Sequence, residues 1–132
     1  MTTMNHEELF ALEHIGYTLI QHDKLSDAQK LFAGLSLLSN ASWYSHYALG
    51  LIAKKQRNYP QAIAHLQHAQ KLHHQLPSHE KNYQPDLALA KLFILTNNLA
   101  NSRQTLSSII QHTSSDHAAN STARALLKAV QK

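Results

Sequence analysis

The feature that most constrains the fold of this chain is an internal repeat. The segment 25–32, LSDAQKLF, is matched 34 residues later by 59–66, YPQAIAHL, and a third copy, LANSRQTL at 99–106, follows 40 residues after the second. The six extra residues fall around 76–81, LPSHEK, a polar segment with a proline. A period in the thirties is typical of chains that stack helix pairs, and such an insertion belongs in a connection between helices.

Small residues recur in register with this repeat, and a large apolar residue follows each pair of them. The small pairs are Gly16 with Ala28, Gly50 with Ala62, and Ala90 with Ser102, and the large residues are Phe32, Leu66 and Leu106. This spacing resembles tetratricopeptide repeats, in which small residues let two antiparallel helices touch. We therefore expect an all-α fold: three tetratricopeptide-type helix pairs plus a C-terminal capping helix, in a right-handed superhelical stack with a concave groove.

Apolar periodicity and capping residues predict seven helices. They are expected at about 8–21, 26–38, 42–55, 60–75, 84–97, 100–112 and 117–131. Asn5 and Ser26 are expected to cap the first two helices, and the segment 113–116 the last. The last helix should cover the open end of the stack with Ala123, Leu126, Leu127 and Val130. The prediction is one domain over 1–132, with repeats at about 9–42, 43–76 and 83–116 and the capping helix at about 117–131.

The composition argues against several classes of protein. Cysteine is absent, which excludes a disulfide framework, a thiolate nucleophile and a cysteine-ligated zinc site. The first ten residues do not read as a signal peptide, and no segment approaches the roughly 20 apolar residues that span a bilayer. The net charge of +4 comes from basic residues scattered along the chain, so nucleic-acid binding is not favoured. We expect a cytoplasmic protein without a membrane partner.

Catalytic and metal-binding chemistry finds little support in the sequence. There are eleven histidines, and His65 and His68 share a helix face with His73 and His74 following, but no Asp or Glu lies near His65 and His68 in sequence. Most carboxylates fall at expected helix starts or turns, where they complement the helix dipole. No phosphate loop, GxSxG or HExxH motif is present. We expect no metal, no cofactor, no catalytic residue and no enzymatic activity.

The concave face of such a stack is its binding surface, and it is lined by the first helix of each pair. By repeat register the groove residues are Phe10, Glu13, Tyr17, Ile20, Tyr44, Tyr47, Leu51, Lys54, Gln84, Leu87, Lys91 and Ile94. The tyrosines suit an extended peptide, and Lys54 and Lys91 suit acidic groups. For each aromatic residue the alternative is ordinary packing between helices. Trp43 is expected to pack against the preceding repeat.

The sequence also resembles one particular family, the class II chaperones of type III secretion, which guard translocator proteins. The resemblance runs from about Leu12 to Gln131. It is carried by 27–32 with Leu35 and Leu38, by 49–51, by 59–63, and by the tail segments 109–112 and 123–130. The tail is the more telling part, because generic repeats do not share it.

The resemblance implies a cytoplasmic chaperone whose groove holds an extended segment of a secreted, membrane-inserting translocator until export. Many members of the family dimerise, so a homodimer is compatible with this interpretation. Tyr17 stands at a groove position that is aromatic in the family, so this chain keeps an aromatic residue there. Glu13 and Ile20, by contrast, stand where family members often have tyrosine. The insertion at 76–81 is a further departure from the family.

Two other hypotheses remain open from the sequence. A generic repeat adaptor, or a partner protein of a secretion apparatus, would bind a component of a larger assembly, for instance through Lys54 and Lys91. A metal- or nucleic-acid-binding module is the third hypothesis. The sequence names neither the client nor the oligomeric state, and it leaves open whether the ligand is extended or helical.

Overall fold

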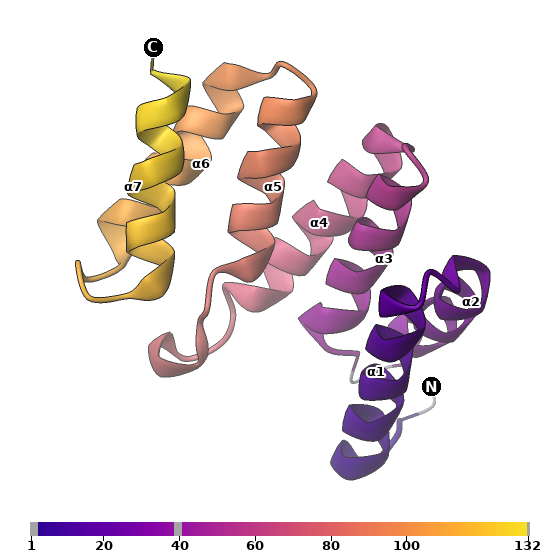
Figure 1. The fold of residues 1–132 in the computed structure, drawn as a ribbon. Helices are drawn as coiled ribbons and strands as arrows, with labels where there is room; N and C mark the ends of the chain where they lie inside the picture. The colour runs from indigo at the N-terminus through magenta and orange to yellow at the C-terminus, as the bar shows by residue number, and fades with distance from the viewer. Residues whose placement is uncertain (1–2, 39–40, 132) are drawn as a thin grey trace. The chain divides into compact units, whose positions relative to one another are not determined.

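The computed structural model describes residues 3–38 and 41–131, and within these ranges the chain forms helices and no strand. The elements are α1 (His6–Gln21), α2 (Leu25–Ser36), α3 (Trp43–Lys55), α4 (Tyr59–His73), the 3₁₀ helix η1 (Ser78–Glu80), α5 (Gln84–Leu95), α6 (Leu99–His112) and α7 (Ala118–Val130) (Figure 1). The all-α class is confirmed, and each expected helix is present within two residues of its predicted bounds.

The chain divides into two compact units, Met1–Leu72 and His73–Lys132. The first unit contains α1, α2, α3 and nearly all of α4, and the second contains η1, α5, α6 and α7. In the first unit α2 packs on both α1 and α3, and in the second α6 packs on both α5 and α7. The single domain over 1–132 stays a prediction.

The same turn joins the two helices of every pair. Its central residue has a left-handed backbone, with φ of 61° at Asp23, 62° at Arg57 and 62° at Asn97. The next residue donates its backbone N–H across the turn to the carbonyl five residues earlier: Lys24 to Leu19 at 2.9 Å, Asn58 to Ala53 at 2.9 Å and Asn98 to Phe93 at 2.7 Å. This is the Schellman pattern that satisfies the last carbonyls of a helix. The sequence repeat is therefore a repeat of backbone geometry.

The helix starts are capped by a mixture of expected and unexpected residues. Asn5 Oδ1 accepts from Glu8 N–H at 2.8 Å, which confirms the predicted cap of α1. Ser26 was the wrong cap for α2, because the helix already begins at Leu25 and Lys24 at its N-cap position makes no side-chain cap. The cap of α7 is His117, whose Nδ1 accepts from Ala119 N–H at 3.0 Å, and not a residue of 113–116. At the equivalent position of the second turn, Asn58 Oδ1 accepts from Gln61 N–H at 3.4 Å, so the missing cap of α2 follows from lysine standing at that position.

The small residues of the repeat lie where two helices touch, as predicted. A Cβ atom on Gly16 would lie 2.4 Å from the ring of Phe32, and one on Gly50 would lie 2.7 Å from Leu66 Cγ. In the third pair the small residue on the second helix is Ser102, whose buried hydroxyl donates to the Ala90 carbonyl at 3.1 Å. Each pair thus uses a missing or minimal side chain to bring its helices together.

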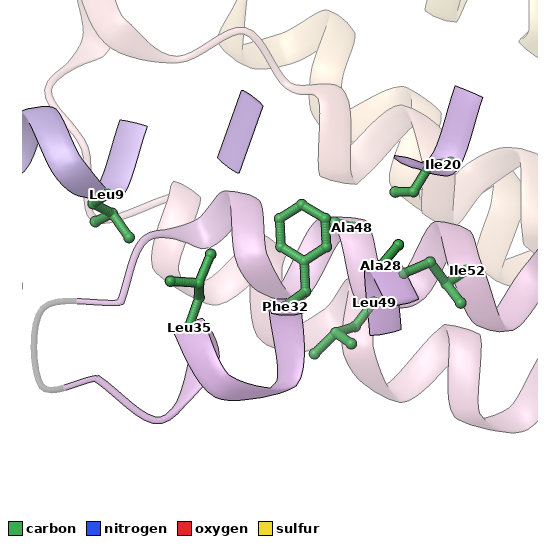
Figure 2. Close-up of a cluster of buried hydrophobic side chains, with 8 residues drawn as sticks. All are labelled: Leu9, Ile20, Ala28, Phe32, Leu35, Ala48, Leu49 and Ile52. Carbon is green, nitrogen blue, oxygen red and sulfur yellow. The ribbon is translucent and has the colours of Figure 1, made fainter. Parts of the chain in front are cut away.

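The core of the first unit forms around the first of these contacts. Figure 2 shows its buried side chains, which are Leu9, Ile20, Ala28, Phe32, Leu35, Ala48, Leu49 and Ile52. They come from α1, α2 and α3, and Phe32 is fully buried among them. Burying a side chain of this kind contributes roughly 1.5–3 kcal/mol. The cluster therefore holds three helices in one arrangement.

The core of the second unit includes the predicted face of the last helix. Ala119, Ala123 and Val130 of α7 are buried against Ala90 of α5 and against α6, and Leu126 and Leu127 pack on the same cluster. The predicted apolar face of this helix is confirmed, and α7 covers α5 and α6.

The insertion between the second and third pairs is ordered by polar contacts with α4 and α7. It contains η1, and Tyr83 at its end has a φ of 60°, a conformation that bulky residues rarely adopt. His73 Nε2 lies 3.0 Å from Asn82 Oδ1, and His117 Nε2 lies 3.3 Å from the Lys81 carbonyl. The Tyr83 ring packs edge-on against the rings of His73 and His117. These contacts fix the start of α5.

The close contact at Gly16 predicts a large effect from a single methyl group. Gly16→Ala should lower the free energy of unfolding by about 1–3 kcal/mol, because the buried Phe32 ring cannot move away. Chemical denaturation monitored by circular dichroism would measure it.

The matched control is Gly34→Ala in α2, where an added Cβ would meet nothing within 4 Å. This variant should be neutral or more stable by up to about 1 kcal/mol, because alanine favours a helix interior over glycine. Equal effects of the two substitutions would contradict the close-contact account.

Candidate partner-binding site

Part of the predicted groove comes together within the first unit, on α1 and α3. Glu13 and Tyr17 are one turn apart on α1, and Tyr44 and Tyr47 are one turn apart on α3. The two helices contact each other. Tyr44 interacts electrostatically with Glu13, Tyr17 and Tyr47, and Tyr47 with Tyr17, which places the four side chains close together. We call Glu13, Tyr17, Tyr44 and Tyr47 the tyrosine patch.

The rings of the patch are held by one another and by the core. Tyr44 lies edge-on to the buried Phe32 with ring centroids 5.9 Å apart, and Tyr44 and Tyr47 are also separated by 5.9 Å. Trp43 contacts both tyrosines, at 5.7 and 5.6 Å, so its packing partners include these residues of its own helix. Tyr44 and Tyr47 are half-buried, whereas 42% of Tyr17 is exposed. The patch is thus an aromatic surface whose rings pack on one another and on the core, and the ring of Tyr17 is accessible.

Glu13 connects this surface to the start of α3. Ser42 donates its hydroxyl to Glu13 Oε2 and accepts from Tyr44 N–H at 3.2 Å, as the N-cap of α3. The carboxylate therefore lies near a helix N-terminus, where the dipole favours negative charge. Burial nevertheless raises the pKa of Glu13, and the Ser42 hydrogen bond and the charge of His6 oppose that rise. Sequence reasoning missed the Ser42 contact, since 29 residues separate the two.

Tyr44 and Tyr47 of the patch are neutral hydrogen-bonding groups at ordinary pH, because the pKa of each is raised. Burial, and then the neighbouring Tyr17, Tyr47 and Glu13, raise the pKa of Tyr44 to about 12. Burial, with Tyr17, also raises the pKa of Tyr47. A neutral phenol donates one hydrogen bond and offers an apolar ring, which suits a polypeptide backbone and its side chains.

The remaining predicted groove residues of the first unit have different environments. Phe10 is 72% exposed, Lys54 is exposed and Leu51 is half-buried. Ile20 was wrongly predicted to face the groove: it is 5% exposed and belongs to the core. It lies one turn after Gly16, on the side of α1 that packs against α2, and this contact removes it from any binding surface.

The predicted groove residues of the second unit all lie on α5. Gln84 and Lys91 are exposed, whereas Leu87 and Ile94 are half-buried and pack on the core that α5 shares with α6 and α7. Lys91 is the charged member of this set.

Two histidines of the first unit stack on each other, and one histidine of the second unit pairs with a carboxylate. His46 and His68 stack with ring centroids 3.9 Å apart and an angle of 17° between the planes. In the second unit His74 Nε2 lies 2.8 Å from Asp86 Oδ2, and Asp86 is buried. Over the described ranges, no three His, Asp or Glu side chains are arranged to hold a metal ion. No described helix is both long and apolar enough to cross a membrane.

Acidification should destabilise the protein through histidines that are wholly or partly buried. Burial, with His68 and His65, lowers the pKa of His46 from 6.5 to about 4, and burial also lowers the pKa of His65 and His73. The unfolded chain therefore binds these protons at higher pH than the folded protein does. As far as these histidines determine it, the free energy of unfolding should be highest above about pH 6.5 and fall as the pH drops toward about 4.

His46→Gln should make this decline shallower between about pH 6.5 and pH 5, a window above the ordinary carboxylate titrations. Urea denaturation at several pH values measures the slope for both proteins. Identical slopes would show that the stacked histidine is not a source of the pH dependence.

Comparison with known proteins identifies the fold. No protein-family model matches the sequence, and no curated protein matches it. Solved structures do match: PcrH from Pseudomonas aeruginosa has a TM-score of 0.79 at 21% sequence identity, covering 98% of this chain and 96% of PcrH. The type III secretion translocator chaperone SycD from Yersinia enterocolitica has a TM-score of 0.78 at 16% identity, covering 97% and 86%.

A further match is a complex. SycD bound to a peptide of the translocator YopD matches with a TM-score of 0.78 at 16% identity, covering 96% of this chain and 95% of SycD. PcrH has also been solved with the chaperone binding regions of PopD and PopB. At sequence identities of 16–21%, the likeness concerns the fold alone. The chain therefore has the all-α fold of the PcrH and SycD chaperones.

Proposed function

We propose that the protein is a cytoplasmic chaperone of type III secretion. It binds an extended segment of a secreted translocator-type protein on the tyrosine patch and keeps that protein soluble until export. The single observation that carries the proposal is the patch itself, three tyrosines and a carboxylate gathered on α1 and α3. The fold supports it, because PcrH and SycD have been solved with translocator segments bound.

The chemistry of the patch suits an unfolded segment. An extended chain presents backbone carbonyls that have no partner, and neutral phenols donate to them. The apolar side chains of such an extended chain are removed from water when they contact aromatic faces, which favours binding. Tyr44 and Tyr47 already pack against Phe32 and Trp43, so little side-chain freedom is lost when a client binds.

Other predicted groove residues extend the proposed contact. Phe10 and Leu51 offer apolar surface beside the patch, and Lys54 offers a cation two turns beyond Tyr47 on α3. The equivalent face of α5, with Leu87, Lys91 and Ile94, is proposed to contact the client as well. The proposal assigns a binding role and no catalytic residue.

A second candidate is an adaptor that binds a folded component of a larger assembly. The exposure of both Lys54 and Lys91 favours it, since exposed lysines suit an acidic surface or a chain terminus. Binding through them would weaken steeply with salt.

The first test is capture of partners from the source cells with the tagged protein, followed by mass spectrometry. We expect recovery of a secreted protein with apolar, membrane-inserting segments. Recovery of folded cytosolic or apparatus proteins alone would favour the adaptor.

The patch itself is tested by Tyr17→Ala. Removing this accessible ring should weaken the captured complex at least about tenfold, because aromatic residues dominate the energy of such interfaces. Isothermal titration calorimetry measures the affinity. The control is Leu37→Ala, which truncates an apolar side chain that is 80% exposed and outside the patch. Equal affinities of the two variants would place the client elsewhere.

A further inference from the structure

Glu13 is an unusual member of an apolar binding surface. The residue is half-buried, its charge acts on Tyr44, and one of its carboxylate oxygens accepts from Ser42. Across residues 3–38 and 41–131, no lysine or arginine forms an ion pair with it. The charge of His6, seven residues earlier on α1, acts on it and favours its ionised form.

The charged form of such a carboxylate is stabilised when a cation binds beside it. Burial has removed part of its water, which raises its pKa and makes its charged form less favourable than in solution. A cation that enters the same site compensates for that loss. The interaction is also stronger than at an open surface, because the surroundings are less polar than water.

The tyrosine rings of the patch favour the same kind of group. The faces of aromatic rings carry partial negative charge, and they attract ammonium and guanidinium groups within about 6 Å. Tyr17, Tyr44 and Tyr47 all interact electrostatically with one another or with Glu13 in this patch. A carboxylate and several phenol rings together form a chemical environment for a cation, and they disfavour an acidic side chain.

Glu13 also has a structural role, which the test has to separate. Its hydrogen bond with Ser42 connects α1 to the N-cap of α3. That role needs only an acceptor oxygen, and a glutamine side chain supplies one. Binding of a cation needs the negative charge, which glutamine lacks. Glu13→Gln therefore keeps the first role and removes the second.

We propose that Glu13 and the tyrosines around it form a subsite for one basic side chain, so that the segment which this protein binds carries a lysine or arginine among its apolar residues. This inference rests on the proposed function, because it assumes that the patch binds an extended segment. It goes further in stating the chemistry of that segment.

The experiment is a selection from a random peptide library displayed on phage, against the wild-type protein and Glu13→Gln in parallel. We expect the wild type to enrich apolar peptides with a lysine or arginine at a recurrent position. Glu13→Gln should enrich apolar peptides without that preference. Glu7→Gln, which removes an exposed carboxylate elsewhere on α1, should select like the wild type.

A selected lysine peptide and its norleucine analogue then provide a double-mutant cycle by fluorescence anisotropy. Glu13→Gln should weaken the lysine peptide about tenfold, as expected for loss of a charged hydrogen bond. It should leave the norleucine analogue nearly unchanged. Thermal unfolding of Glu13→Gln should match or exceed that of the wild type, which excludes damage to the fold.

The other outcomes separate the two proposals. Apolar peptides without a basic preference, selected by both proteins and lost in Tyr17→Ala, would overturn the cation subsite and leave the proposed function standing. Peptides that bind Tyr17→Ala as well as the wild type, or no enriched peptides at all, would overturn binding at the patch and the subsite with it.

Discussion

The close approach of paired helices at the small residues is the constraint on which the rest of this structure depends. Phe32 occupies the space that a side chain on Gly16 would fill, and Leu66 does the same at Gly50. The ring of the buried Phe32 in turn packs edge-on against the ring of Tyr44, with 5.9 Å between the ring centroids. A packing requirement inside the first helix pair thus determines where the aromatic surface of the next pair lies. The core and the proposed binding surface are therefore one continuous set of contacts.

The patch keeps features that a core would not tolerate. Its carboxylate is partly desolvated, and burial raises its pKa. Tyr17 of the patch and Phe10 beside it expose large apolar surfaces to water. Each of these is unfavourable or neutral for folding by itself, and each becomes favourable against a partner of complementary chemistry. Local conflicts of this kind are expected where a surface is used for binding rather than for stability.

The repeat made most of the fold predictable. Its spacing identified the helices, the turns and the small residues at helix contacts, and the resemblance to secretion chaperones anticipated the fold shared with PcrH and SycD. Capping residues were less predictable. Ser26 has the right chemistry for a cap, but the Schellman turn starts α2 one residue earlier. His117 caps α7 although histidine is an uncommon N-cap, because its other ring nitrogen lies near the Lys81 carbonyl.

The candidate site was only partly predictable, and the reason is physical. Helical periodicity assigns Glu13, Tyr17 and Ile20 to one side of α1, but it does not say where the boundary between buried and exposed falls on that side. The packing of α2 decides this, and it buries Ile20 while leaving Tyr17 accessible. The sequence by itself determined the helices, their pairing and their close contacts, because these depend on short-range spacing that repeats along the chain. Only the tertiary structure decided the contacts between Ser42 and Glu13 and between His46 and His68, because such pairs meet only after separate helices pack together.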